Sequence, residues 1–358
     1  MKKSFENILP YVSGLRFWII FASIVIVLAA MKEARYIINI ILLAFFITSI
    51  SIGPIEWMKK KGLPELWAIL IMILSFIVVI SLTIFIVGSS VNNFVLKMPY
   101  YNERFNRLWL ETHRWLVEHG FVNKNFSPLQ ELNPGNILKI AGGFFTGFGN
   151  VMGTFFLVFI IYVFMLFEIS VFSRKLKLIK PKSVQSVDEV LRSLVKYFGI
   201  KTLTSFSTGF FIAIGLLILG VDFPVLWGFL AFILNFIPSI GSFIAAIPAV
   251  LLSLILLGPF GALITVIMYF VINTIIGNII EPQLMGRNLG ISPLFVFVAM
   301  IFWGYILGTI GMLIATPLII MIKIILDSRP VTKDIGTLLG NGLTVHALED
   351  EQKKQDLM

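Results

Sequence analysis

The sequence is organised as long apolar runs separated by short polar segments. A hydrocarbon core of about 30 Å needs about 20 helical residues, and six of the runs meet that length. We therefore predict an all-α, polytopic membrane protein with about six full transmembrane helices and two re-entrant or broken helical hairpins. The six predicted spans are residues 15–31, 36–53, 66–91, 141–167, 199–221 and 258–280.

Two further apolar blocks, residues 224–257 and 293–326, are too long for one straight helix. The first is interrupted at residues 238–242 and the second at residues 308–311, so each has a break near its middle. The arm before the first break, residues 225–237, is too short to cross a bilayer. Non-helical backbone at membrane depth is tolerated only inside protein or against a water-filled cavity. Both blocks are therefore predicted to be hairpins.

The two breaks share a short pattern. After Ile240-Gly241 and after Ile310-Gly311 come two residues, then Ile-Ala, then one or two further residues, and then a proline. This suggests a weak internal repeat, although such patterns also arise by chance in membrane helices. With the N-terminus inside, the two hairpins enter from opposite sides. That inverted relation is common in alternating-access transporters.

Composition supports a membrane protein. Hydrophobic residues make up 58% of the chain and charged residues 13%, whereas soluble domains carry about 25% charged residues. A cytosolic enzyme, a nucleic-acid binder and a secreted disulfide scaffold are thereby excluded. The net charge of +9 fits basic cytoplasmic loops such as Lys59-Lys60-Lys61, and this orientation places both termini in the cytoplasm. The chain has no cysteine, so it has neither disulfides nor thiolate metal sites.

The polar segments divide the chain further. Residues 92–140 carry an amphipathic helical pattern and are predicted to lie outside the membrane, on the headgroups or against a neighbouring subunit. A capping box at residues 186–189 predicts the start of an inner amphipathic helix. The predicted parts are a scaffold of residues 1–91 and 141–167, the extracytoplasmic segment 92–140, the cytoplasmic helix 168–198, a transport unit 199–326 and a cytoplasmic polar tail 327–358.

Motifs for enzyme chemistry are missing from the sequence. The three histidines stand in polar segments without a second histidine at ligand spacing, and no phosphate-binding loop is present. We therefore expect no enzyme activity, no metal and no cofactor, apart from coupling to H⁺ or Na⁺.

Polar residues inside the predicted spans cluster in the second half of the chain, where burial makes them costly and hence informative. Glu281 could carry a proton in a coupling cycle, or it could cap a helix or pair with Arg287. The glycines around the second break fit close helix packing as well as a functional role, and Pro238-x-x-Gly241 could simply turn the chain. The transport-path candidates are Asn235, Pro238, Ser239, Gly241, Ser242, Asn273, Asn278, Glu281 and Pro282, and the hairpin-break and packing candidates are Gly304, Gly308, Gly311 and Pro317.

Four ordered motifs resemble those of the autoinducer-2 exporter family of bacterial permeases. They lie at residues 235–242, 278–286, 289–293 and 302–318. The resemblance implies a transporter of the bacterial inner membrane, similar to elevator-type carriers assembled as homopentamers, with autoinducer-2 as the named substrate. Some relatives are associated instead with sodium–proton antiport.

The working hypothesis is secondary export of a small polar solute, plausible substrates being autoinducer-2 or a related metabolite. The alternatives are a sodium- or lithium-proton antiporter, a membrane scaffold without cargo, and a channel. Besides the solute or cation, the expected partners are the lipid bilayer and further copies of the chain, with no nucleic acid.

Overall fold

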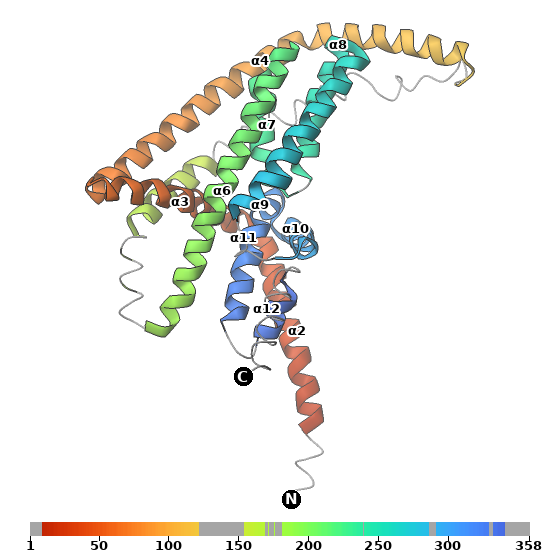
Figure 1. The fold of residues 1–358 in the computed structure, drawn as a ribbon. Helices are drawn as coiled ribbons and strands as arrows, with labels where there is room; N and C mark the ends of the chain where they lie inside the picture. The colour runs from red at the N-terminus through yellow and green to blue at the C-terminus, as the bar shows by residue number, and fades with distance from the viewer. Residues whose placement is uncertain are drawn as a thin grey trace, which may run out of the picture.

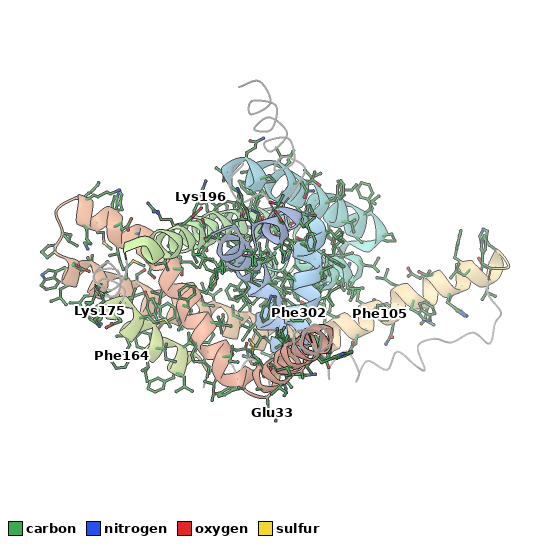
Figure 2. All side chains as sticks on the ribbon, turned by 90° about the horizontal axis from the view of Figure 1, so that it is seen from below. Glu33, Phe105, Phe164, Lys175, Lys196 and Phe302 are labelled. Atoms are coloured by element: carbon green, nitrogen blue, oxygen red, sulfur yellow. The ribbon has the colours of Figure 1, made fainter. Side chains whose placement is uncertain are left out.

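The computed structural model confirms an all-α fold, with no strand in the part of the chain that it describes (Figure 1). Five helices within that part are long and apolar enough to cross a membrane. Large apolar side chains cover much of the outer surface, as expected where lipid replaces water (Figure 2). The described residues are 9–121, 154–168, 171, 175, 181–238, 240–285, 291–328 and 332–340.

The N-terminal region consists of three long helices. Helices α2 (Leu9–Glu33) and α3 (Arg35–Lys60) contain the first two predicted spans. Helix α4 (Glu65–Glu118) has 54 residues and contains the third span, but it does not stop at residue 91 as expected. It continues into the predicted extracytoplasmic segment with Pro99 inside it, since a proline can bend a helix without ending it. In Figure 1, α4 bends and extends away from the bundle.

The helix Thr154–Glu168 is the described part of the fourth predicted span. It packs against α3 and α4 through an apolar cluster that includes Ala44 and Tyr162. The hydroxyl groups of Ser51 and Tyr162 lie 3.0 Å apart, so the one polar group of this ring is satisfied inside the cluster. Residues 141–153, with the remainder of that span, are outside the described residues.

Helix α6 (Pro181–Leu219) joins two elements that the sequence separated. The predicted capping box at residues 186–189 falls inside this helix instead of starting it, and the helix passes without interruption into the predicted span 199–221. Neither proline nor a turn sequence stands between the two parts, so the helix continues. The result is one 39-residue helix that contacts α3, α7, α8 and α11.

The first hairpin consists of α7 (Pro224–Leu234) and α8 (Gly241–Asn273), separated by an irregular tip. At the tip a β-carbon on Gly241 would collide with the carbonyl oxygen of Leu234, so glycine is required where the two arms meet. Gly258, with φ 75°, bends α8 at the end of the predicted block 224–257. Ser239 lies outside the described residues.

The second hairpin consists of α10 (Pro293–Leu307) and α11 (Thr309–Asp327), and Gly308 separates them with φ 71° and ψ −152°. Between the hairpins the chain forms a π-helix, η2 (Thr274–Ile280), and the short helix α9 (Glu281–Met285). Part of the predicted polar tail is ordered, since α12 (Lys333–Leu338) packs on α11 and the amide of Ser292 donates to the carbonyl of Leu339 at 3.0 Å.

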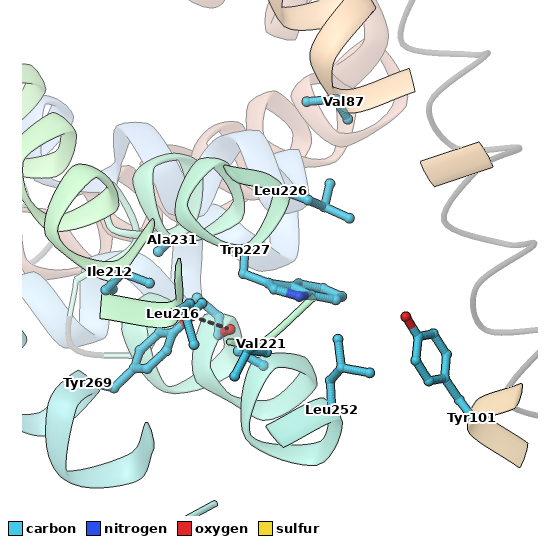
Figure 3. Packing of buried hydrophobic residues seen from close by; sticks show 12 residues of the cluster. Val87, Tyr101, Ile212, Leu216, Val221, Leu226, Trp227, Ala231, Leu252 and Tyr269 are labelled. Atoms are coloured by element: carbon cyan, nitrogen blue, oxygen red, sulfur yellow. Dashed lines mark hydrogen bonds between the residues drawn. The ribbon is translucent and has the colours of Figure 1, made fainter. Parts of the chain in front are cut away.

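The hairpins are held in place by buried apolar clusters. The largest one joins α6, α7 and α8 to Val87 and Tyr101 of α4. In Figure 3, Tyr101 of α4 faces Trp227 and Leu252, and Val87 of α4 lies on the side of Leu226. A second cluster brings Ile237, from the tip of the first hairpin, against α10 and α11. The two hairpins therefore meet at the tip of the first.

Candidate functional site

A cavity of about 530 Å³ lies where the tip of the first hairpin meets α6, η2 and the second hairpin. Six of the transport-path candidates line it, although they are spread over nearly 50 residues of sequence. These are Asn235, Pro238, Ser242, Asn273, Asn278 and Glu281. Further lining residues are Tyr197, Lys201, Phe243, Ala246, Val266, Tyr269, Phe270, Thr274, Gly277, Met285, Val296 and Thr316.

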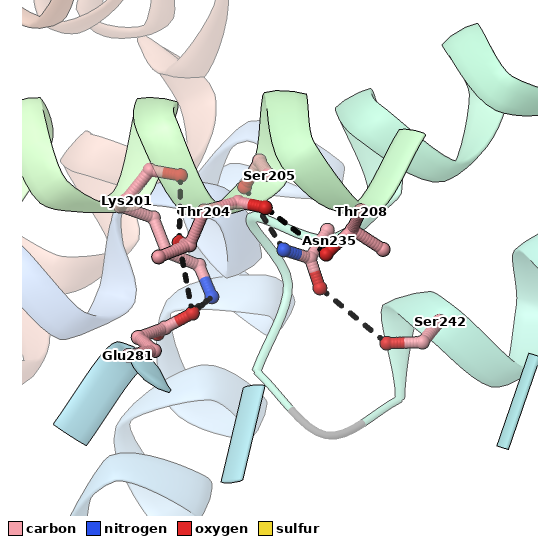
Figure 4. Close-up of polar contacts among 7 residues, drawn as sticks. All are labelled: Lys201, Thr204, Ser205, Thr208, Asn235, Ser242 and Glu281. Carbon is pink, nitrogen blue, oxygen red and sulfur yellow. Dashed lines mark hydrogen bonds and ion pairs between the residues drawn. The ribbon is translucent and has the colours of Figure 1, made fainter. Parts of the chain in front are cut away.

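Asn235 connects the hairpin tip to α6. It is 6% exposed, and its Nδ2 donates to Ser205 Oγ at 3.0 Å. Its Oδ1 accepts from Ser242 Oγ at 3.5 Å, across the tip (Figure 4). The amide therefore bridges a neighbouring helix and both arms of the hairpin. This bridge adds to the backbone hydrogen bonds of the tip, such as the one from the amide of Gly241 to the carbonyl of Ile237 at 3.2 Å, and helps to fix its conformation.

Glu281 is held by an ion pair with Lys201, a residue that the sequence interpretation did not select. Lys201 Nζ lies 2.8 Å and 2.9 Å from the two carboxylate oxygens, and Thr204 Oγ1 donates to one of them at 3.1 Å (Figure 4). The two charged side chains are only 8% and 15% exposed. A charge this deeply buried is tolerated when it is paired and hydrogen-bonded. Arg287, the partner suggested from sequence, is outside the described residues.

Lys201 belongs to a polar stripe on α6. Lys201, Thr204, Ser205 and Thr208 stand at positions i, i+3, i+4 and i+7, which is one face of a helix, and each is at most 6% exposed. The stripe contacts both Glu281 and Asn235. The same spacing is readable in the sequence as polar residues recurring on one face of an apolar span, so a signal for this part of the site was present.

The π-helix contributes a second part that the sequence did not predict. The amide of Glu281 donates to the carbonyl of Ile276, five residues earlier, which is the π-helical pattern. Thr274, Gly277 and Asn278 of this segment all line the cavity. Short π-helical insertions occur often at functional sites, because they realign side chains within a helix.

The remaining walls combine four aromatic rings with aliphatic side chains. Tyr269 lies on α8 with its hydroxyl 3.5 Å from the carbonyl oxygen of Ala245, and Asn273, one turn later, donates to the carbonyl of Tyr269 at 2.8 Å. Tyr197 of α6 and Phe243 of the hairpin add further ring surface. Rings that alternate with amides and hydroxyls suit a small polar solute that also has an apolar face.

The other predicted residues lie around the cavity rather than in its lining. Gly241 shapes the hairpin tip, and Pro282 is an exposed residue in the first turn of α9. The candidates near the second break are packing residues: a β-carbon on Gly311 would collide with the carbonyl oxygen of Trp303, and one on Gly304 would lie 2.8 Å from Met312. Pro317 is buried in α11. Gly308 forms the break itself.

The tip of the second hairpin is covered by α2 and α3. Ile306, Leu307 and Ile314 form an apolar cluster against these helices. Asn39 Nδ2 of α3 donates to the carbonyl of Leu307 at 3.0 Å, beside the break. The Oδ1 of the same side chain is buried and has no hydrogen-bond partner among the described residues. This tip is thus mainly an apolar contact, to which the Asn39 hydrogen bond and the contact of Lys32 Nζ with the ring of Tyr305, 3.7 Å from its centroid, add polar interactions.

The site has the chemistry of a binding cavity. Its charges are balanced by the Lys201–Glu281 pair, and its other polar groups are amides and hydroxyls that can donate or accept hydrogen bonds. Such groups recognise and orient a solute without breaking a bond in it.

Known proteins with similar sequences are transport proteins. A family model described as AI-2E family transporter matches residues 19–330. The chain is 30% identical to "Putative transport protein YhhT" of Escherichia coli (strain K12), over 93% of this chain and 96% of that protein. It is 33% identical to a "Putative transport protein" of Haemophilus influenzae, over 89% of this chain and 94% of that protein.

A further relative has a more specific name. The chain is 32% identical to "AI-2 transport protein TqsA" of Escherichia coli (strain K12), over 92% of this chain and 96% of that protein. The family model and these relatives each cover most of the sequence, and the apolar helices fit repeated crossing of a membrane. This chain therefore belongs to the AI-2E transporter family and is a multi-pass membrane transport protein rather than an enzyme.

Proposed function

We propose that this protein is a secondary carrier that exports a small polar solute through the cavity between the first hairpin and η2. The observation that carries the proposal is the convergence of six polar or hairpin-tip residues on one cavity at a helix break. Freed backbone groups and amides at a break can coordinate a solute inside a membrane protein. The volume of about 530 Å³ lies within the range usual for small-molecule sites.

A hydroxyl-rich solute such as autoinducer-2, or a related metabolite, suits this lining, and the name of the relative TqsA supports that choice. Asn235, Ser242 and Asn278 would exchange hydrogen bonds with the solute, while the aromatic walls cover its apolar face. We further propose an elevator-like movement, in which the two hairpins and the helix between them carry the cavity past α3 and the helix Thr154–Glu168.

Transport from reconstituted vesicles loaded with radiolabelled autoinducer-2 tests the proposal. Asn235→Ala and Glu281→Gln should each lower the efflux rate at least tenfold, because the first removes an amide that lines the cavity and the second removes the negative charge that pairs with Lys201. Gln283→Ala is the matched control, since this exposed amide lies beside Glu281 but outside the cavity, and it should leave the rate unchanged. Efflux at the unaltered rate in both cavity variants would exclude this site from transport.

Sodium- or lithium-proton antiport is the second candidate, and the buried Lys201–Glu281 pair favours it. A carboxylate that exchanges an ammonium group for a metal cation, or accepts a proton, could link cation movement to proton movement. A pH-sensitive dye in vesicles, with and without Na⁺ or Li⁺, distinguishes antiport from solute export. If neither cation changes the internal pH, while the solute still leaves, antiport is excluded. Coupling of export to H⁺ or Na⁺ is tested by imposing each gradient in turn.

The cellular setting completes the proposal. We place the protein in the bacterial inner membrane with both termini in the cytoplasm, as the positions of the basic loops suggest. We expect assembly into a homopentamer, with lipid covering the remaining apolar surface. Native mass spectrometry of the detergent-solubilised protein measures the number of copies. Accessibility of tags at each terminus, in intact and permeabilised cells, measures the orientation.

A scaffold without cargo is disfavoured by membership of a transporter family.

A further inference from the structure

Helix α4 belongs to two separate groups of packed helices. Near its start, Ala68 and Ile69 pack with α3 and the helix Thr154–Glu168. Further along the helix, Val87 and Tyr101 pack with α6, α7 and α8 (Figure 3). Between these contacts, residues 77–86 are mostly exposed. The helix therefore connects the predicted scaffold to the first hairpin by a stretch with little packing in the described part of the chain.

The contact of α4 with α6, α7 and α8 has a polar centre at Asp222, in the turn between α6 and α7. Asp222 Oδ2 lies 3.0 Å from Lys97 Nζ and accepts a hydrogen bond of 2.6 Å from the hydroxyl of Tyr101, which is 3% exposed. Its backbone carbonyl accepts from Trp227 Nε1 at 3.0 Å. Asp222 is thus held by α7 through its backbone and by α4 through its side chain.

A second polar contact lies one helical turn further along α4. The guanidinium of Arg104 donates to the carbonyl of Leu256 at 2.7 Å. Leu256 stands in the last turn before the bend of α8 at Gly258, where helical carbonyls lose their intrahelical partners. Lys97, Tyr101 and Arg104 are at positions i, i+4 and i+7, which is one face of α4. This face contacts the first hairpin where α7 begins and where α8 bends, away from the tip.

We propose that these contacts fasten residues 87–104 of α4 to the first hairpin as one moving body. Residues 77–86 are then the connection that flexes when this body moves against α3. The outer part of α4 consequently travels with the hairpins, and α4 acts as a hinged arm rather than as part of a fixed scaffold. The proposal rests on the carrier movement proposed above, but it can be tested without a solute.

Pulsed electron paramagnetic resonance between two spin labels measures this movement. The chain contains no cysteine, so introduced cysteines are labelled uniquely. One pair joins Leu96 to Phe260, and the other joins Leu74 to Phe260; all three side chains are more than 60% exposed. The Leu96–Phe260 distance distribution should be narrow. The Leu74–Phe260 distribution should be at least twice as wide or have two maxima, because its labels lie on different bodies.

Removing the polar contact should loosen the arm. Asp222→Ala, which removes the acceptor of both bonds, is expected to widen the Leu96–Phe260 distribution at least twofold, and Lys97→Gln, which retains the Tyr101 bond, to widen it less. Glu103→Gln is the matched control: it breaks the exposed pair of Glu103 with Arg107, 3.0 Å apart on the same helix, and should leave the width unchanged. Thermal unfolding of each variant in detergent confirms that it is folded.

The outcomes separate this proposal from the proposed function. A Leu96–Phe260 distribution as wide as that of Leu74–Phe260, or an unchanged width in Asp222→Ala, would overturn the fastened arm while leaving the cavity as a transport site. Narrow distributions for both pairs would overturn the flexing stretch and the elevator-like movement together. Loss of solute efflux in the cavity variants bears on the proposed function alone.

Discussion

Each hairpin has a glycine where its two arms approach each other, yet the two tips have different surroundings. In each, the glycine of the Ile-Gly pair allows the second arm to pass the backbone carbonyl of the first, at Leu234 for Gly241 and at Trp303 for Gly311. The first tip lies against the polar stripe of α6 and borders a cavity. The second tip is covered by apolar side chains of α2 and α3.

The difference shows that a helix break supplies the opportunity for a binding site but does not by itself create one. At the first tip, the side chains of Asn235 and Ser242 continue the polar surface of α6 into the cavity. Beside the second break the one side-chain amide is Asn39 of α3, and it satisfies the carbonyl of Leu307. The first tip therefore has side chains that can donate and accept hydrogen bonds beside a cavity, whereas the second lies in a mainly apolar contact with α2 and α3.

The largest expected effect concerns the ion pair beside the first tip. Lys201→Met leaves the buried carboxylate of Glu281 unpaired, and we expect a loss of stability of about 3 kcal/mol or more. The double variant Lys201→Met with Glu281→Gln should recover most of that loss, because neither remaining group is charged. Thermal unfolding followed by tryptophan fluorescence in detergent measures both.

A surface pair provides the control for this prediction. Lys59 and Glu65 lie 3.1 Å apart with side chains 42% and 33% exposed, and Lys59→Met should cost less than about 1 kcal/mol. Equal losses in Lys201→Met and Lys59→Met would show that the inner pair is solvated, and the polar character assigned to the first tip would then need revision.

The next effect concerns the two glycines. Gly241→Ala and Gly311→Ala should each destabilise the fold by about 1–3 kcal/mol, because the added β-carbon displaces the opposite arm. Only Gly241→Ala should also lower solute efflux per folded molecule, since its tip borders the cavity. Efflux from vesicles, normalised to the amount of folded protein, separates the two effects.

Gly199→Ala is a suitable control, because this exposed helical position has open space around it. The substitution should leave stability unchanged or raise it by up to about 1 kcal/mol. If Gly311→Ala lowers normalised efflux as much as Gly241→Ala does, the functional distinction between the hairpins is lost.

The smallest effect is expected at Asn39, and its counterpart at the first tip, Asn235, provides the comparison. Asn39→Leu removes one hydrogen bond, but it also removes an oxygen that is buried without a partner among the described residues, so stability should change by less than about 1 kcal/mol. Asn235→Leu leaves buried Ser205 without its amide donor and should cost about 1–3 kcal/mol. Chemical unfolding of both variants under the same conditions measures the difference. The reverse order of the two losses would contradict the comparison.

Much of the first hairpin could be predicted from its residues. Pro238 and Gly241 mark the break because their backbone preferences are local, and Asn235 and Ser242 stand out because polar side chains are rare in apolar blocks. The sequence interpretation did not select Lys201, because its partner Glu281 is 80 residues away and the spacing of the polar residues along α6 was not recognised as one face of a helix. The continuous course of α4 was missed because the change from apolar to amphipathic sequence was read as a helix end.

By itself, the sequence determined that the chain is helical, that it crosses a membrane, and that the apolar blocks 224–257 and 293–326 are each broken. These features follow from hydrophobicity, helix length and the conformations open to proline and glycine, all of which act over a few neighbouring residues. Only the tertiary structure decided that one break faces a polar cavity and the other an apolar joint. That outcome depends on which helix packs against each tip, and α6 and α3 are brought there by contacts between residues far apart in the chain.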